Sequence, residues 1–428
     1  MKILYLCPDL GIPVLGRKGA SVHVRELVGA FAREGHRVTL AAQTLLKIPT
    51  DEPAKVKARV IQVPPDAAAV SAVHDLKEFN HLLGAESPLP GEMRRILYNL
   101  ALYRELKRRF LKHKPDFIYE RASLYATAGA KLAAKFNVPH LVELNAPLAI
   151  EQAEYRATGF GELAAHAERW TLTHADAVVV VSSELAKHVK ALGVKSSKIH
   201  VMPNGVNPEL FCAVPGRARH SVRATVTSAS HGARGVMRPT IGFVGGLRPW
   251  HGVEVLPELL ARLSRRHPDL RMIIAGDGQL RGELKRRFKQ RGLSKRVTFT
   301  GALLHEEVPQ VIRRFDIALA PYPKHDHDFY FSPLKLFEYM ACGVAVVAAK
   351  QGQVAEVVNH GKTGLLYPAG NLAELAANCE RLLGDAPLRR KLGEAAARLV
   401  LGKFTWNHNA ARVVALARSL GAARRGRR

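Results

Sequence analysis

Residues 331–348 read FSPLKLFEYMACGVAVVA and predict a helix that leads directly into a buried strand. Ser332 is a favourable N-cap residue, and Pro333 suits the first position of a helix. Gly343 fits the residue that ends a helix. The run Val344–Ala348 is apolar without alternation, which is typical of a strand buried on both faces of a parallel sheet. This stretch therefore predicts one helix–strand unit of an α/β protein.

The same alternation of short apolar strands and amphipathic helices extends along the chain in both directions. The expected strands are 3–7, 38–42, 117–119, 141–144 and 177–181 in the first half, and 240–244, 271–275, 297–299, 317–320 and 344–348 in the second. This order predicts an α/β fold with two Rossmann-like, doubly wound domains. Open sheets of this kind bind ligands at the carboxyl ends of their strands, so we expect the domains to face each other across a cleft.

Composition divides the chain into four parts. Residues 1–211 form the expected first domain, in which 48–90 predicts an irregular insertion and 92–112 a long helix. Residues 212–238 hold five Arg and no acidic residue and predict an exposed linker. Residues 239–400 form the expected second domain, and residues 401–428 a final helix with a basic tail.

Length and charge restrict the class of protein. The 428 residues suit two large domains, and the formal net charge is +27. Much of the excess lies in the linker and in residues 389–428, where eleven basic residues accompany the single acid Glu394. No zinc-finger, RNP or KH pattern accompanies the charge, so nucleic acid is excluded as the main substrate. The excess is read either as an attraction to anionic surfaces or as a solvated basic tail.

The expected location is the cytoplasm. The four Cys residues are far apart and share no CxxC spacing, which fits a reducing compartment. The apolar run at the start is too short for a signal peptide, and no later run approaches 18 residues.

Lys335 stands in the first turn of the helix that follows Ser332, where a cation opposes the helix dipole. A phosphate or pyrophosphate at the helix N-terminus would remove that cost. Glu338 lies on the same face and could accept the hydroxyls of a ribose. The alternative is a solvated Lys–Glu pair on a surface helix. No GxGxxG follows either domain's first strand, so a dinucleotide-dependent dehydrogenase is disfavoured.

Several segments resemble the retaining GT-B-fold glycosyltransferases of glycosyltransferase family 4, in the family's order and over nearly the whole chain. They are KGASVHVRELVGAFAREGHRVTL, VMPNGVNPELF, FVGGLRPWHGVEVL, IIAGDGQLRGEL, SPLKLFEYMACGVAVVA, GKTGLLYPAG and FTWNHNAARVV. The resemblance implies transfer of a sugar from a nucleotide-diphosphate sugar, with retention and without a metal or other cofactor. It also implies an acceptor-side first domain, a donor-binding second domain, and a C-terminal helix that packs back on the first.

The resemblance also assigns residues to the donor site. In the second domain these are Gly246, Arg248, His251, Lys335, Leu336 and Glu338, and in the first domain Gly19 approaches the donor phosphate. An Arg suits a diphosphate because its charge never titrates away and its fork fits phosphate oxygens. The catalytic set expected from these assignments is Glu143, Arg248 and Lys335.

Two positions depart from the family pattern. His251 stands where the family usually has a Lys, so the diphosphate clamp is expected to be weaker or pH-sensitive. Tyr330 stands eight positions before Glu338, where the family has the first of two Glu residues. Asp326 and Asp328 lie nearby in His325–Asp328, a run that also permits a metal-binding interpretation, although adjacent ligands on one loop rarely close a site.

Glu143 ends an expected strand of the first domain and has two interpretations. It could hydrogen-bond or help deprotonate an acceptor hydroxyl, or it could form a structural ion pair with a residue such as Arg121. The resemblance assigns the acceptor proton largely to the departing phosphate. Paired carboxylates of the glycosidase type have no support in the sequence.

The expected partners are a nucleotide-sugar donor and an acceptor that is a saccharide, a lipid-linked molecule or a small molecule, in glycan, glycolipid or polysaccharide synthesis. The helix near 92–114 carries several basic residues and is read either as a core-facing amphipathic helix or as a peripheral contact with anionic membrane at its inner face. A nucleotide-sugar epimerase and a non-catalytic sugar-binding protein are the alternative functions.

Overall fold

The computed structural model describes residues 1–48, 52–155, 158–212 and 238–426. These residues form two compact units, each built on its own sheet. Unit 1 comprises Met1–Pro203, Tyr330–Ser332 and Trp406–Arg428, and unit 2 comprises Asn204–Phe329 and Pro333–Thr405. The predicted linker 212–238 lies outside the described residues except at its two ends.

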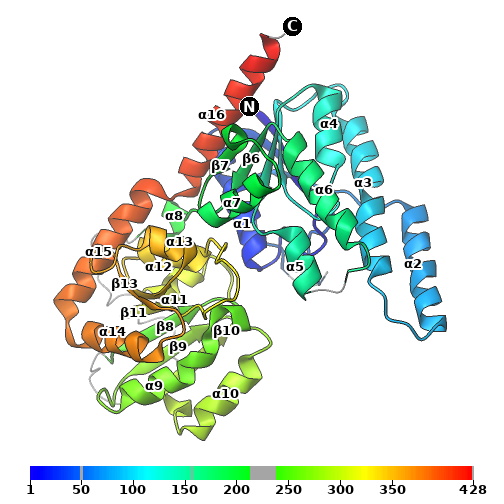
Figure 1. Ribbon diagram of the computed structural model, residues 1–428. Helices are drawn as coiled ribbons and strands as arrows, with labels where there is room; N and C mark the ends of the chain where they lie inside the picture. The colour runs from blue at the N-terminus through cyan, green and yellow to red at the C-terminus, as the bar shows by residue number, and fades with distance from the viewer. Residues whose placement is uncertain (49–51, 156–157, 213–237, 427–428) are drawn as a thin grey trace. The chain divides into compact units, whose positions relative to one another are not determined.

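Unit 1 contains a seven-stranded parallel sheet flanked by helices (Figure 1). Its strands, in spatial order, are β3 (Arg59–Gln62), β2 (Arg37–Ala42), β1 (Lys2–Cys7), β4 (Phe117–Arg121), β5 (His140–Leu144), β6 (Ala177–Val180) and β7 (Ile199–Val201). Its helices are α1 (Gly19–Arg33), α2 (Ala67–Leu82), α3 (Leu89–Phe110), α4 (Ala128–Phe136), α5 (Leu148–Tyr155), α6 (Gly161–His174), α7 (Ser183–Ala191) and α16 (Trp406–Arg425). The strand order reverses between β1 and β4, which is where such sheets place a ligand.

Unit 2 contains a six-stranded parallel sheet of the same winding. Its strands, in spatial order, are β10 (Val297–Gly301), β9 (Arg271–Ala275), β8 (Thr240–Val244), β11 (Ile317–Ala320), β12 (Ala345–Lys350) and β13 (Leu365–Pro368). Its helices are α8 (Pro208–Phe211), α9 (Leu256–Ser264), α10 (Arg281–Gln290), α11 (Val308–Ile312), α12 (Leu334–Ala341), α13 (Gly352–Val357), α14 (Leu372–Gly384) and α15 (Ala386–Lys403). The order reverses between β8 and β11, so the expected pair of doubly wound domains is confirmed.

The predicted irregular insertion at 48–90 is wrong for much of its length, because it contains β3 and α2. Only Val73 of α2 is buried, so the sequence carries no apolar period to reveal this helix. α2 lies side by side with α3 and adds a helical hairpin to unit 1 (Figure 1). Packing against α3 therefore stabilises a helix that local sequence does not predict.

Two domain limits differ from those expected. Unit 1 ends at Pro203 and not at 211, because α8 belongs to unit 2. There the Arg313 guanidinium donates to the carbonyls of Leu210 and Cys212, at 3.3 and 3.2 Å. At the other end, unit 2 extends through α15 to Thr405, and the final helix begins at Trp406 rather than near 401.

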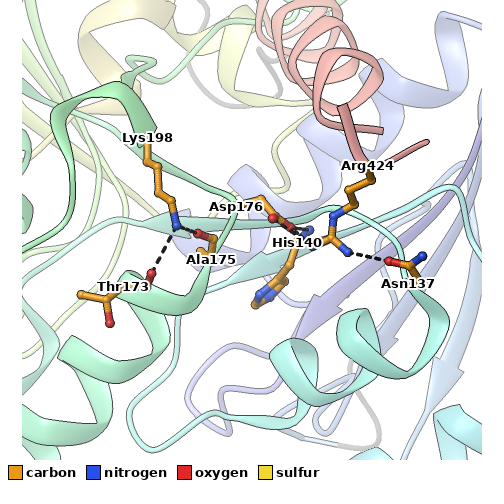
Figure 2. A network of polar contacts seen from close by, with 7 residues as sticks. All are labelled: Asn137, His140, Thr173, Ala175, Asp176, Lys198 and Arg424. Atoms are coloured by element: carbon orange, nitrogen blue, oxygen red, sulfur yellow. Dashed lines mark hydrogen bonds and ion pairs between the residues drawn. The ribbon is translucent and has the colours of Figure 1, made fainter. Parts of the chain in front are cut away.

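The final helix α16 belongs to unit 1. The Trp406 ring packs edge-on against His23 of α1, with centroids 4.8 Å apart, and Arg33 donates to the Asn407 side chain at 3.0 Å. Near its far end, Arg424 donates to both oxygens of Asp176, at 2.7 and 2.9 Å (Figure 2). This helix is thus held to unit 1 at both ends.

Candidate functional site

The loop after β8 requires glycine for steric reasons. Gly245 has φ 137°, and a Cβ there would lie 2.8 Å from the Lys335 ammonium nitrogen. Gly276, after β9, has the same φ, and its Cβ would lie 2.0 Å from the Gly245 carbonyl oxygen. Only glycine adopts such a conformation readily, and only glycine leaves room for this approach. The two loops consequently stack at the carboxyl ends of their strands, directly beside Lys335.

Lys335 is a buried cation of unit 2. Its side chain is buried, and its ammonium lies 4.2 Å from the centroid of the Phe243 ring and 5.4 Å from that of Tyr322. Within the part of the chain that the structure describes, this ammonium has no hydrogen-bond partner. Burial lowers the pKa of Lys335 to about 7, although the Glu338 carboxylate opposes that change. A buried cation without a hydrogen bond is costly, and an anion in contact with it removes the cost.

The helix that carries Lys335 begins one residue later than predicted. Pro333 has φ −78° and ψ 111°, so it is the extended N-cap, and α12 starts at Leu334. The prediction of Ser332 as the N-cap is therefore wrong, and the N-cap residue Pro333 makes no side-chain capping bond. Leu336 lies in the same turn, but its side chain is fully buried and its N–H donates to the Pro333 carbonyl at 3.1 Å.

Glu338 has a partner that sequence analysis missed. The His305 Nε2 lies 2.9 Å from the Glu338 Oε1, and both side chains are largely buried. His305 follows β10, so it reaches the carboxyl edge of the sheet from a different strand. In the sequence, the one feature that points to His305 as a site residue is its position after the end of a strand. Glu338 is thereby oriented, and it is not the solvated surface residue of the alternative interpretation.

His251 feels the charge of both expected phosphate cations. Its Nδ1 is 2.5 Å from the Gly246 carbonyl, and since a carbonyl only accepts, Nδ1 carries the proton. Burial, followed by the charges of Lys335 and Arg248, lowers the pKa of His251 to about 3. The imidazole is therefore neutral at ordinary pH, and its one donor is already used on Gly246.

Arg248 is exposed on the same loop. Its Nη1 donates to the Gln279 side chain at 2.7 Å, and its guanidinium lies 5.8 Å from the Trp250 ring. The charges of Arg248 and Lys335 both lower the pKa of His251, so both cations act on the same imidazole. The structure thus brings Gly246, Arg248, His251, Lys335 and Glu338 together at the reversal of strand order in unit 2.

Glu143 and Gly19 belong to unit 1. The buried Glu143 carboxylate contacts four side chains: His23 and Tyr119 at 2.6 Å, Asn145 at 2.5 Å and Arg121 at 3.2 Å. Burial alone would raise the pKa of Glu143, but His23, Arg121 and Tyr119 outweigh burial and lower it to about 2. Such a carboxylate stays ionised and is a weak proton acceptor. The contact with Arg121 is the structural ion pair that was one of the two interpretations of Glu143.

Gly19 is the exposed first residue of α1. The loop before it is fixed by Arg25, which donates to the carbonyls of Val14 at 3.0 Å and Gly16 at 2.5 Å. Four residues beyond Gly19 stands His23, a residue that sequence analysis did not single out. It joins α1 to Glu143 at the carboxyl end of β5.

Tyr330 packs in unit 1. Its hydroxyl donates to Glu151 at 2.7 Å, and its carbonyl accepts from the Ser182 hydroxyl at 2.8 Å. The position where the resemblance expects a first Glu is therefore occupied by a phenol committed to another carboxylate.

Among the described residues, the one group of side chains with metal-ligand spacing is His74, Asp75 and Glu78, exposed on α2. The run His325–Asp328 does not form such a group in that part of the chain. No helix formed by the described residues is long and apolar enough to cross a membrane.

Two family models match the chain. "Glycosyltransferase Family 4" matches residues 17–210, and "Glycosyl transferases group 1" matches residues 238–385. These matches fall on the two units and leave the stretch between them unmatched. The chain therefore carries the two domains of the GT-B glycosyltransferases of family 4 and group 1.

Curated relatives agree with this assignment. The alpha-D-kanosaminyltransferase of Streptomyces kanamyceticus is 32% identical over 43% of this chain, and the match spans 46% of that protein. The D-inositol 3-phosphate glycosyltransferase of Jonesia denitrificans is 28% identical over 70% of this chain and 71% of that protein. The chain thus spans about half of the first relative and more of the second.

Solved structures share the fold over nearly the whole chain. The sucrose-phosphate synthase of Thermosynechococcus elongatus has a TM-score of 0.72 at 20% identity and covers 99% of both chains. Anabaena HepE, solved in complex with UDP-glucose, has a TM-score of 0.63 at 19% identity, covering 97% of this chain and 99% of that one.

Proposed function

We propose that this protein transfers a sugar from a nucleotide-diphosphate sugar to an acceptor hydroxyl with retention of configuration. The observation that carries the proposal is the buried Lys335 ammonium under the glycine loop of unit 2, without a hydrogen-bond partner among the described residues. A diphosphate is the ligand that such a cation, a neighbouring Arg248 and a helix N-terminus would together bind. HepE, whose fold this chain shares, binds UDP-glucose, which supports a donor of the same class.

In the proposed reaction, the bond between the sugar anomeric carbon and the diphosphate oxygen breaks while the acceptor oxygen bonds to that carbon on the same face. The acceptor proton passes to the departing diphosphate, so no protein base is required. Lys335 and Arg248 stabilise the negative charge that develops on the leaving group, an effect that usually contributes strongly to catalysis. Glu338, oriented by His305, accepts hydrogen bonds from donor hydroxyls.

Glu143 has a positioning role in this proposal. Its carboxylate is held by four side chains and has a pKa of about 2, which makes it a poor base for an acceptor hydroxyl. It fixes Arg121 and Asn145, which can then face an acceptor bound at the carboxyl edge of unit 1. The absence of a metal requirement is part of the proposal, because the cations that bind the diphosphate belong to the chain.

The test is a panel of nucleotide sugars, assayed for release of nucleoside diphosphate with and without acceptors. We expect turnover that survives EDTA and falls at least about 100-fold in Lys335→Ala, as for loss of one charge-stabilising group. Lys362→Ala, which removes an exposed lysine from the same unit, is the matched control and should retain full activity. Wild-type activity in Lys335→Ala would refute the site.

Product analysis separates this proposal from the alternatives. An epimerase would convert the donor sugar without any acceptor, and a non-catalytic protein would bind the donor without turnover. The acceptor is proposed to be a saccharide, a small molecule or a lipid-linked molecule at the inner face of the membrane. In α3, Tyr98, Leu102 and Leu106 are buried, so this helix packs its apolar face on the core and leaves its basic residues to contact anionic lipid.

A further inference from the structure

A cavity of about 700 Å³ lies at the amino ends of the unit 1 strands, the sheet edge opposite the one that carries Glu143. Its lining includes Lys2, Arg37, Lys57, Arg59, His36 and His113, and it contains no acidic residue. The apolar part of the lining includes Phe110, the last residue of α3. This volume lies within the usual range for small-molecule sites.

The strand register directs three of these cations to one face of the sheet. Lys2 is the register partner of Arg37, and Arg59 is the partner of Thr39, two residues after Arg37. Register partners and residues two apart along a strand point to the same side of a sheet. The cations therefore share the face on which Leu4, Ala41 and Ile61 pack, and Phe110 packs against that same cluster.

The four Lys and Arg side chains of this cavity have no carboxylate partner within the described parts of the chain. Asp116, an acid beside this cavity, accepts from the backbone N–H of Lys2 at 2.6 Å and forms no ion pair with these side chains in the described parts of the chain. Burial, followed by the N-terminal ammonium and Arg418 of α16, lowers the pKa of His36, although the Glu34 carboxylate opposes that change. Neighbouring strands are only about 4.8 Å apart, so these like charges repel one another.

We propose that this basic cavity binds an organic phosphate, with its phosphate groups on Arg37, Lys57 and Arg59 and its apolar body against Phe110. An anion there neutralises cations that otherwise repel each other, and the half-buried ring supplies an apolar wall. The site lies in unit 1 and at the amino edge of its sheet, so it is separate from the donor site of unit 2. A nucleotide in solution and a phospholipid headgroup offer the same chemistry.

The test is calorimetric titration of the full-length protein with ATP, for wild type and for Lys57→Gln/Arg59→Gln. Both residues are exposed, and Arg59 begins an edge strand, so the double variant should fold, which circular dichroism checks. Lys131→Gln/Lys135→Gln on α4 removes the same charge from exposed positions of the same unit and is the matched control. Lys335→Met reports any ATP bound at the donor site.

We expect saturable one-to-one binding that weakens at least tenfold in Lys57→Gln/Arg59→Gln and less than twofold in the control and in Lys335→Met. A second arm uses phosphatidylcholine vesicles with and without phosphatidic acid, whose headgroup is an exposed phosphate on an anionic surface. Vesicle binding that is lost in the same double variant, without ATP binding, assigns the phosphate to a lipid headgroup. Equal affinity in wild type and double variant, or no binding of either probe, overturns the proposal.

Discussion

Raising the pH from 7 to 9 should weaken nucleoside diphosphate binding, because Lys335 loses its proton over this range. The pKa of this lysine is about 7 without ligand, against about 10.4 for an exposed lysine. The difference corresponds to about 5 kcal/mol that burial costs the charged form. A bound diphosphate repays much of this cost by contact with the ammonium, so binding raises the pKa of Lys335 and takes up a proton above pH 7.

The magnitude follows from this linkage. Above pH 7 each further pH unit leaves one tenth as much of the charged form, so affinity should fall about tenfold per unit until the bound-state pKa is reached. The assay is calorimetric titration with UDP, or with the diphosphate that the donor panel selects, in two buffers of different ionisation enthalpy. Their difference counts the protons taken up, which should approach one at pH 8.

Lys335→Met is the matched variant, because it keeps the length of the buried side chain and removes the charge. Its affinity should be low and independent of pH over the same range. The pH dependence of the protein's stability has the opposite sign to that of a lysine in a favourable ion pair. Because the folded-state pKa lies below the unfolded value, the unliganded protein gains stability as pH rises from about 7 to 10, and Lys335→Met should not. Wild-type affinity that is constant from pH 6 to 9 would refute this account of the site.

Three further predictions concern one residue of unit 1 and two of unit 2. Glu143→Gln should destabilise unit 1 by about 3 kcal/mol in denaturant unfolding, because it leaves Arg121 and His23 without their carboxylate. The wild type should keep this stability at neutral pH and lose it only as the pH falls from about 4 toward 2. His251→Ala should leave the pH dependence of diphosphate affinity unchanged, because the imidazole is neutral above about pH 3; a flattened titration curve would contradict this. Gly252→Ala should lower the melting temperature by several degrees, because φ is 68° and the added Cβ would lie 1.7 Å from the Pro321 carbonyl oxygen. Gly246→Ala is the control and should leave the melting temperature unchanged, because its Cβ would have no neighbour closer than 3.6 Å.

Much of the sheet architecture is predictable because its strands are short apolar runs. Val344–Ala348 is an example: the observed strand β12 spans Ala345–Lys350, one residue later at its start. Edge elements are less predictable, because their stability comes from a neighbour and not from their own pattern. β3 has four residues and α2 buries one side chain, so neither gives a periodic signal.

The start of α12 shows a second limit of sequence analysis. Ser332 and Pro333 form a favourable N-terminal pair by residue type, yet the structure shifts the helix by one position. Tyr330–Ser332 packs within unit 1 while the residues after it belong to unit 2, so tertiary contacts determine the backbone there. Local capping preference contributes only about 1 kcal/mol and is readily overridden.

The charge state of a site residue is the least predictable property, because it depends on partners that are distant in sequence. Glu143 could be a base or half of an ion pair until His23 and Tyr119, from two other elements, are seen to hold it ionised. Lys335 has an acidic neighbour in sequence, Glu338, but that carboxylate contacts His305. The Lys335 ammonium lies against two aromatic rings instead.

These two environments imply different roles for the two units. Unit 1 surrounds a carboxylate with donors, which fixes its charge and geometry over the whole physiological pH range. Unit 2 leaves the Lys335 ammonium buried with no hydrogen-bond partner among the described residues. The pKa of this ammonium is about 7, so it loses its proton close to neutral pH. A group of the first kind suits positioning, since ligands do not change its state. A group of the second kind gains most of its stabilisation only when an anion arrives, so the binding energy of a diphosphate is concentrated at the atoms that leave in the proposed reaction.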